Sequence, residues 1–166
     1  AQKVVKTIKI GRYPRGIAIS NDSKLAYVAE MGGNRIHVIN LEDFTVTYIP
    51  IGSNPRAIVL SPDNTKMYVT MNLSGKVASW DLVTNMAGKS VKTGEAARSL
   101  AISSDGSTMF VVNFKSNTMS KVRTSDMKVL ETIKACKEPI GVTYDTPTGN
   151  TWVACYKGQI KIYSNN

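Results

Sequence analysis

Apolar and polar positions alternate along the chain in a pattern that recurs four times. Each copy has a short apolar run, a turn rich in Asp, Asn, Ser and Gly, a second apolar run with an aromatic residue, and a polar loop. The runs have the length of β-strands, and these turn residues favour tight connections between strands. No segment shows a helical period of useful length. The pattern therefore predicts an all-β protein built from four repeats.

The repeats align on a Gly-x-x-Pro-Arg motif, present as GRYPR and GSNPR and, in weaker form, as GEAAR and CKEPI. The motifs start at residues 11, 52, 94 and 136, which gives spacings of 41, 42 and 42 residues. Four strands in a repeat of this length are typical of a β-propeller blade. We predict a single propeller domain with repeats at about 11–51, 52–93, 94–135 and 136–166, the last completed by 4–10.

The second strand of each repeat carries a related tetrad. The four tetrads are Tyr27-Val-Ala-Glu30, Tyr68-Val-Thr-Met71, Phe110-Val-Val-Asn113 and Trp152-Val-Ala-Cys155. With the Ser-Pro-Asp-Asn turn at 61–64, they resemble the YVTN family of β-propeller repeats. This resemblance covers essentially the whole chain and implies a propeller fold, but little about activity. Since the family is often found outside the cytoplasm, it also implies an extracellular or periplasmic, secreted protein.

The two ends of the repeat pattern are complementary. The last repeat stops after its third strand, QIKIYSNN, whereas the N-terminal sequence VVKTIKI at 4–10 matches the fourth strands TVTYIPI and KVLETIKA. We expect residues 4–10 to complete the last blade and so close a ring of four four-stranded antiparallel blades. Half of an eight-bladed ring made by two chains, or a fragment of a larger propeller, are the alternatives; the chain is then a monomer or a homodimer.

Charge is the compositional feature that bears on function. The 166 residues hold 21 Lys and Arg against 12 Asp and Glu, a net charge of +9. In a propeller, the loops equivalent to 11–15 and 30–35 share one face, here called the top face. These loops hold nine basic and three acidic residues, a net +6, whereas the turns on the opposite side hold four basic and eight acidic residues, a net −4. A basic top face indicates an acidic partner.

Three arginines occupy the same repeat position at the start of the innermost strands. Arg15, Arg56 and Arg98 should converge on the mouth of the central channel, where they repel one another unless each is paired. Glu30, Glu95 and Glu138 are candidate partners; otherwise the arginines should bind an anion. The predicted ligand-binding residues are Arg15, Arg56, Arg98, Arg12, Lys115 and Lys157.

The anionic partner is expected to be a small molecule, an acidic glycan or an acidic protein surface. Nucleic acid is less favoured. Tyr13, Phe114 and Tyr156 could stack with bases, but the basic residues lie around a ring rather than along a track. No run of apolar residues is long enough to predict a membrane span.

Catalytic chemistry has little support in the sequence. The single histidine, His37, lies on a predicted third strand, without a second histidine to form a metal site and without a convincing Ser-His-Asp set. No catalytic residue, metal ligand or cofactor is therefore predicted, and the leading expectation is a non-catalytic binding module. The runner-up is a lactonase-like or other hydrolytic propeller, and the third reading is a structural or engineered propeller fragment that assembles into a larger ring.

Two cysteines fall on the predicted top face of the last blade. Cys136 and Cys155 replace Gly11 and Glu30 of the first repeat. They could form a disulfide if their Cα atoms lie roughly 4.4–6.8 Å apart. Two free thiols are the alternative, and the sequence slightly favours them.

Overall fold

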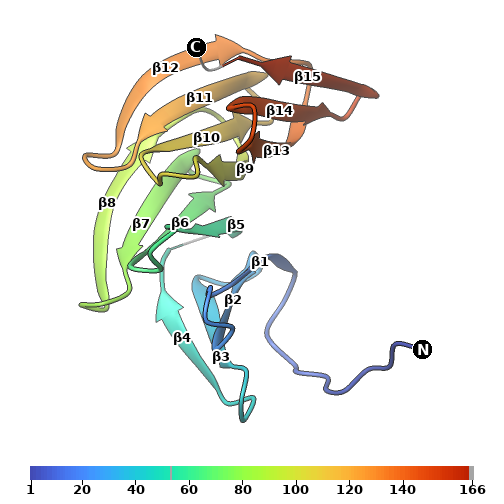
Figure 1. Ribbon diagram of the computed structural model, residues 1–166, viewed down its shortest axis with the longest axis vertical. Helices are drawn as coiled ribbons and strands as arrows, with labels where there is room; N and C mark the ends of the chain where they lie inside the picture. The colour runs from blue at the N-terminus through green and yellow to red at the C-terminus, as the bar shows by residue number, and fades with distance from the viewer. Residues whose placement is uncertain (53, 165–166) are drawn as a thin grey trace.

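The chain folds into four consecutive antiparallel sheets, which are the blades of a propeller (Figure 1). The structure is a computed structural model that describes residues 1–52 and 54–164. Within these ranges there is no helix, and so none that could cross a membrane. The all-β, four-bladed arrangement predicted from the repeats is confirmed.

Each blade is a simple meander in which successive strands are hydrogen-bonded neighbours. The first blade contains β1 (Pro14–Ile19), β2 (Leu25–Glu30), β3 (Arg35–Asn40) and β4 (Val46–Pro50). The second contains β5 (Pro55–Leu60), β6 (Lys66–Met71), β7 (Lys76–Asp81) and β8 (Met86–Lys92). The third contains β9 (Ala97–Ile102), β10 (Thr108–Asn113), β11 (Thr118–Arg123) and β12 (Lys128–Lys134). The fourth contains β13 (Pro139–Asp145), β14 (Asn150–Cys155) and β15 (Gln159–Tyr163).

The turns between first and second strands repeat one hydrogen-bonding scheme. In the second blade the Ser61 hydroxyl donates to Asp63 Oδ1, and the same carboxylate oxygen accepts from the Thr65 backbone N–H at 3.0 Å. Ser20–Asp22 and Ser103–Asp105 form the equivalent pairs in the first and third blades. The Ser-x-Asp spacing therefore sets the turn locally, as the sequence predicted.

Apolar clusters join each blade to the next. The cluster between the first two blades runs from Ile58 on the inner strand β5 to Ile49 on the outer strand β4, with Tyr27 and Met67 between them. Equivalent clusters lie between the second and third blades and between the third and fourth. Because each cluster extends from inner to outer strands, neighbouring blades are held face to face over their whole width.

Four blades packed in this way form an open arc (Figure 1). The first and last blades lie at opposite ends of the arc. Residues 4–10 form no strand, and in the described part of the chain the last sheet has three strands, ending at β15. The predicted closure of the last blade by the N-terminal strand is therefore wrong for this structure. The reason is that the arc carries the two ends of the chain apart.

The N-terminal segment nevertheless packs on the first blade. Ile8 and Ile10 contact a cluster formed by Ala26, Val28 and Ile39, on the face of the blade that points away from the second blade. The repeat alignment makes Ile8 the equivalent of Ile49 and Ile133, which fill the same role between later blades. The segment thus occupies the packing position of a fourth strand against the first blade without pairing as a strand.

Candidate functional site on the top face

The two sets of top loops meet through one hydrogen bond that recurs in every blade. Met31, Asn72, Phe114 and Tyr156 donate their backbone N–H groups to the carbonyls of Tyr13, Asn54, Ala96 and Glu138. The four acceptor residues occupy one repeat position and all have left-handed backbone conformation, with φ between 55° and 57°. This shared geometry places the loop before each inner strand beside the loop after each second strand.

In three of the four blades the last residue of the tetrad anchors the connector that enters the blade. In the first blade the Glu30 carboxylate accepts the Arg12 backbone N–H at 2.8 Å. In the third, Asn113 is fully buried and binds both Thr93 and Ser120. Three different chemistries, a carboxylate, an amide and a disulfide, thus perform the same structural task in three blades.

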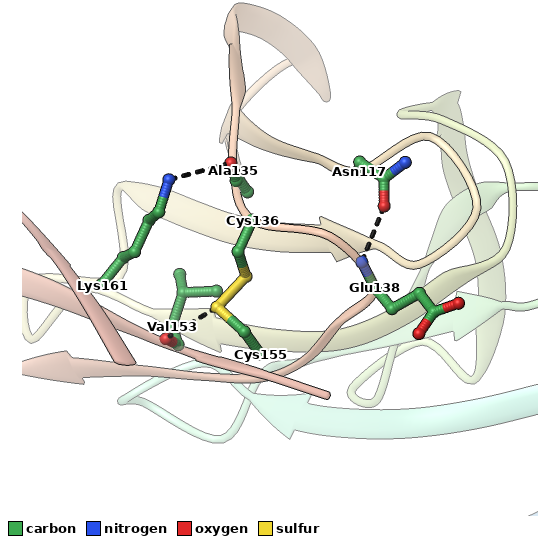
Figure 2. Close-up of a disulfide and its surroundings, with 7 residues drawn as sticks. All are labelled: Asn117, Ala135, Cys136, Glu138, Val153, Cys155 and Lys161. Atoms are coloured by element: carbon green, nitrogen blue, oxygen red, sulfur yellow. Dashed lines mark hydrogen bonds between the residues drawn. A yellow bond between two sulfur atoms is a disulfide. The ribbon is translucent and has the colours of Figure 1, made fainter. Parts of the chain in front are cut away.

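In the last blade the anchor is the disulfide Cys136–Cys155, shown in Figure 2. The two Cα atoms are 5.9 Å apart, and both residues are buried. The connector is held further by the Glu138 backbone N–H, which donates to Asn117 Oδ1 at 2.7 Å. The structure therefore has the disulfide, and the slight preference for free thiols in the sequence analysis was wrong.

Glu30 and His37 form a buried pair in the first blade. His37 Nε2 lies 2.9 Å from Glu30 Oε2, and Arg35 Nε lies 3.5 Å from the same oxygen. The hydrogen bond from the Arg12 backbone, followed by the one from His37, lowers the pKa of Glu30 below its usual value. Glu30 is thus held by Arg12, Arg35 and His37. It forms no ion pair with the three arginines at the inner strands.

Those three arginines lie close enough to influence one another electrostatically. Partial burial, and then the positive charges of Arg98 and Arg15, lower the pKa of Arg56. Burial, and then Arg15, lower the pKa of Arg98. Across residues 1–52 and 54–164, none of the three forms an ion pair with a carboxylate. The predicted pairing with Glu30, Glu95 or Glu138 is therefore not found.

The arginines instead contact soft and aromatic groups. Arg56 Nη1 lies 3.2 Å from the sulfur of Met31, and the Arg98 guanidinium lies 4.6 Å from the centroid of the Phe114 ring. Phe114 in turn meets Tyr156 edge to face at 6.5 Å. Met31 was missed by the sequence analysis, because nothing in the repeat marks it and only the packing of the second blade on the first brings it to Arg56.

The other predicted ligand-binding residues have surroundings of their own. The Arg12 guanidinium covers the ring of Tyr13 at 5.6 Å, and Tyr13 is 58% exposed. Lys115 lines a surface hollow of about 320 Å³ together with Lys92 and Glu95. Lys157 is exposed in the loop after β14. The structure thus brings Arg15, Arg56 and Arg98 within electrostatic range of one another, whereas Arg12 and Lys115 contact other residues and Lys157 is exposed.

Comparisons with known proteins agree with this class of fold. No family model matches the chain. Antigen Lp49 of Leptospira interrogans serogroup Icterohaemorrhagiae serovar copenhageni is 32% identical over 118 residues, which are 66% of this chain and 25% of that protein. Lactonase drp35 of Staphylococcus haemolyticus is 33% identical over 84 residues, 45% of this chain and 25% of that protein. The matches therefore span about a quarter of each curated relative.

Solved structures superpose over nearly all of the four blades. Hydrazine synthase of Kuenenia stuttgartiensis aligns with a TM-score of 0.85 and 19% identity, covering 91% of this chain and 46% of that one. Virginiamycin B lyase of Staphylococcus aureus aligns with a TM-score of 0.72 and 17% identity, covering 91% of this chain and 55% of that one. At this level of identity the likeness establishes the propeller fold alone.

Proposed function

We propose that the chain is a non-catalytic binding module that recognises an anionic group at Arg15, Arg56 and Arg98. The observation that supports this most directly is the unpaired state of the three guanidiniums. The positive charges of Arg98 and Arg15 lower the pKa of Arg56, that of Arg15 lowers the pKa of Arg98, and no carboxylate neutralises the three side chains within the described residues. A bound anion would remove this repulsion and gain charge-assisted hydrogen bonds from several donors at once.

The surroundings of the arginines suggest the chemistry of the ligand. Phe114 and Tyr156 form an aromatic corner beside Arg98, and Tyr156 is 63% exposed. A ligand with sulfate, phosphate or carboxylate groups next to a flat apolar portion would use both kinds of contact. An acidic glycan, an anionic small molecule and an acidic protein loop all meet this description, with the arginines as the shared determinant.

The test is a calorimetric titration of the protein with heparin, used as a generic polyanion, at low ionic strength. We expect Arg15→Gln/Arg56→Gln/Arg98→Gln to weaken binding at least about tenfold, since each lost charge-assisted hydrogen bond contributes about 1.5–3 kcal/mol. The matched control is Lys24→Gln/Lys66→Gln/Lys128→Gln, which removes three positive charges from the opposite side. Equal weakening by both variants would contradict the proposal, because binding would then follow net charge alone.

A hydrolytic function is the second candidate, supported by the partial match to a protein named as a lactonase. The same arginines could then orient a lactone carbonyl or a nearby anionic group. Turnover of a panel of lactones, lost in Arg56→Ala and kept in Lys66→Ala, would support this candidate over simple binding. Absence of turnover together with heparin binding would leave the binding module as the better account.

The disulfide bears on where the protein works. Disulfides persist in oxidising compartments and are rare in reducing ones. Cys136–Cys155 therefore supports the proposal of an extracellular or periplasmic location.

A further inference from the structure

A methionine of the first blade contacts the arginine group. Met31 directly follows the first tetrad; in the other three blades this position holds Asn72, Phe114 or Tyr156. The Met31 backbone N–H donates to the Tyr13 carbonyl at 3.1 Å, which fixes the start of the loop after β2. Its side chain reaches the second blade, where Sδ lies 3.2 Å from Arg56 Nη1. A thioether thus lies beside one of the three arginines that we propose bind an anion.

The sulfur of Met31 orients Arg56 but does not neutralise it. A thioether is a weak hydrogen-bond acceptor, whereas a guanidinium carries five N–H donors and a full positive charge. Within residues 1–52 and 54–164, Arg56 forms no ion pair, and its side chain donates to this sulfur. The guanidinium therefore keeps its charge and further donors for a ligand.

Met31 is also one of the two methionines that solvent reaches. Five of the seven methionines are buried, each with at most 6% of its surface exposed: Met67, Met71, Met109, Met119 and Met127. Met86, on the outer strand β8, is 64% exposed, and Met31 is half-buried. Because oxidation of sulfur side chains depends on exposure, an oxidant added to the folded protein should react with Met86 and Met31 first.

Oxidation would convert the weak acceptor at Met31 into a strong one. In the reaction with a hydroperoxide, the sulfur lone pair attacks a peroxide oxygen, the O–O bond breaks and an S–O bond forms. The sulfur loses two electrons, and the hydroperoxide is reduced to water or an alcohol. The product, methionine sulfoxide, is polar, and its oxygen carries a partial negative charge. A guanidinium donates a stronger, charge-assisted hydrogen bond to such an oxygen than to a thioether sulfur.

We propose that Met31 is a site of oxidation by hydroperoxides, and that its sulfoxide oxygen binds the Arg56 guanidinium and so weakens anion binding at Arg15, Arg56 and Arg98. The sulfoxide oxygen and an oxygen of the ligand would compete for the same N–H donors. The effect on anion binding rests on the proposed function, whereas the oxidation and the contact with Arg56 are independent of it. Met31 is thus a positioning residue whose chemical state sets the number of free donors on Arg56.

The first test measures which methionines take up oxygen. The folded protein is treated with hydrogen peroxide, and peptide mass spectrometry follows each methionine with time. We expect Met86 and Met31 each to gain one oxygen atom before any of the five buried methionines does. The Met86→Leu protein should then gain a single oxygen atom, at Met31, which supplies a uniformly modified sample. Oxidation of the buried methionines ahead of Met31 would overturn the proposal.

The second test measures whether the sulfoxide contacts Arg56. Oxidation of the Met86→Leu protein should shift the side-chain N–H signals of Arg56 in NMR spectra, which are identified by their loss in Arg56→Gln. The matched control is Met31→Leu/Met86→Leu, in which peroxide should leave the Arg56 signals in place because neither accessible thioether remains. Unchanged Arg56 signals in a protein oxidised at Met31 would overturn the proposed contact.

The third test measures the effect on binding by calorimetric titration with heparin. Oxidation of the Met86→Leu protein should weaken heparin binding about three- to tenfold, because one of several charge-assisted donors is then engaged. The same oxidation of Met86→Leu/Arg56→Gln should change the affinity by less than about twofold, since the donor is gone. Equal weakening in both proteins would overturn the proposal, because the sulfoxide would then act without Arg56.

The outcomes distinguish this proposal from the proposed function. Heparin binding that does not depend on the three arginines before oxidation would refute the proposed function, and with it the effect of oxidation on binding. Heparin binding that depends on the arginines but is unchanged when Met31 is oxidised would leave the proposed function standing and refute this proposal.

Discussion

Reducing the disulfide should destabilise the last blade by an amount that follows from its place in the chain. Cys136 and Cys155 are 19 residues apart in the sequence. Cross-linking a loop of about 20 residues removes enough entropy from the unfolded chain to stabilise the fold by about 3 kcal/mol at 25 °C. For a protein of this size, each kcal/mol corresponds to roughly 2–4 °C in melting temperature. We therefore expect reduction to lower the melting temperature by about 6–12 °C.

The assay is thermal unfolding followed by circular dichroism, with and without a reducing agent. Cys136→Ala/Cys155→Ala is the control, since its melting temperature should be insensitive to the reductant. It should also melt somewhat below the reduced protein, because the missing sulfur atoms leave buried space in the cluster with Val153 and Phe110. A reduced protein that melts within 1 °C of the oxidised one would refute the reasoning. The connector would then be anchored by its other contacts, chiefly the hydrogen bond between Glu138 and Asn117.

Two further predictions concern local geometry. Ala96 holds a left-handed backbone with φ of 55°, which disfavours any residue with a Cβ, so Ala96→Gly should raise the free energy of unfolding by up to about 1 kcal/mol in urea titrations. An unchanged or lowered value would show that the strain is absent. Hydrogen bonds from Ser61 and Ser103, followed by backbone N–H groups, lower the pKa of Asp63 and Asp105 to about 2. Because these pKa values lie below the unfolded value of 3.8, the two carboxylates stabilise the folded protein above about pH 4, and this stabilisation is lost as the pH falls towards 2. Carboxyl chemical shifts of Asp63 and Asp105 that titrate near pH 4 would contradict this prediction.

The sequence by itself determined the strands, the turns and the equivalence of the repeats. These features depend on interactions between near neighbours, such as the Ser61 and Asp63 turn, and on an alternation of side chains that is written directly in the chain. The repeat position of Arg15, Arg56 and Arg98 was predicted for the same reason.

The tertiary structure decided which of these groups meet. Whether residues 4–10 reach β15 depends on the angle between successive blades, which is the sum of many contacts in three interblade clusters and is not a property of any short segment. The sequence alone allowed an ion pair between Glu30 and Arg15. In the folded chain the Glu30 carboxylate instead accepts hydrogen bonds from His37 and from the Arg12 backbone N–H. The disulfide likewise required two cysteines 19 residues apart to be brought within 5.9 Å, which only the packing of connector on strand could do.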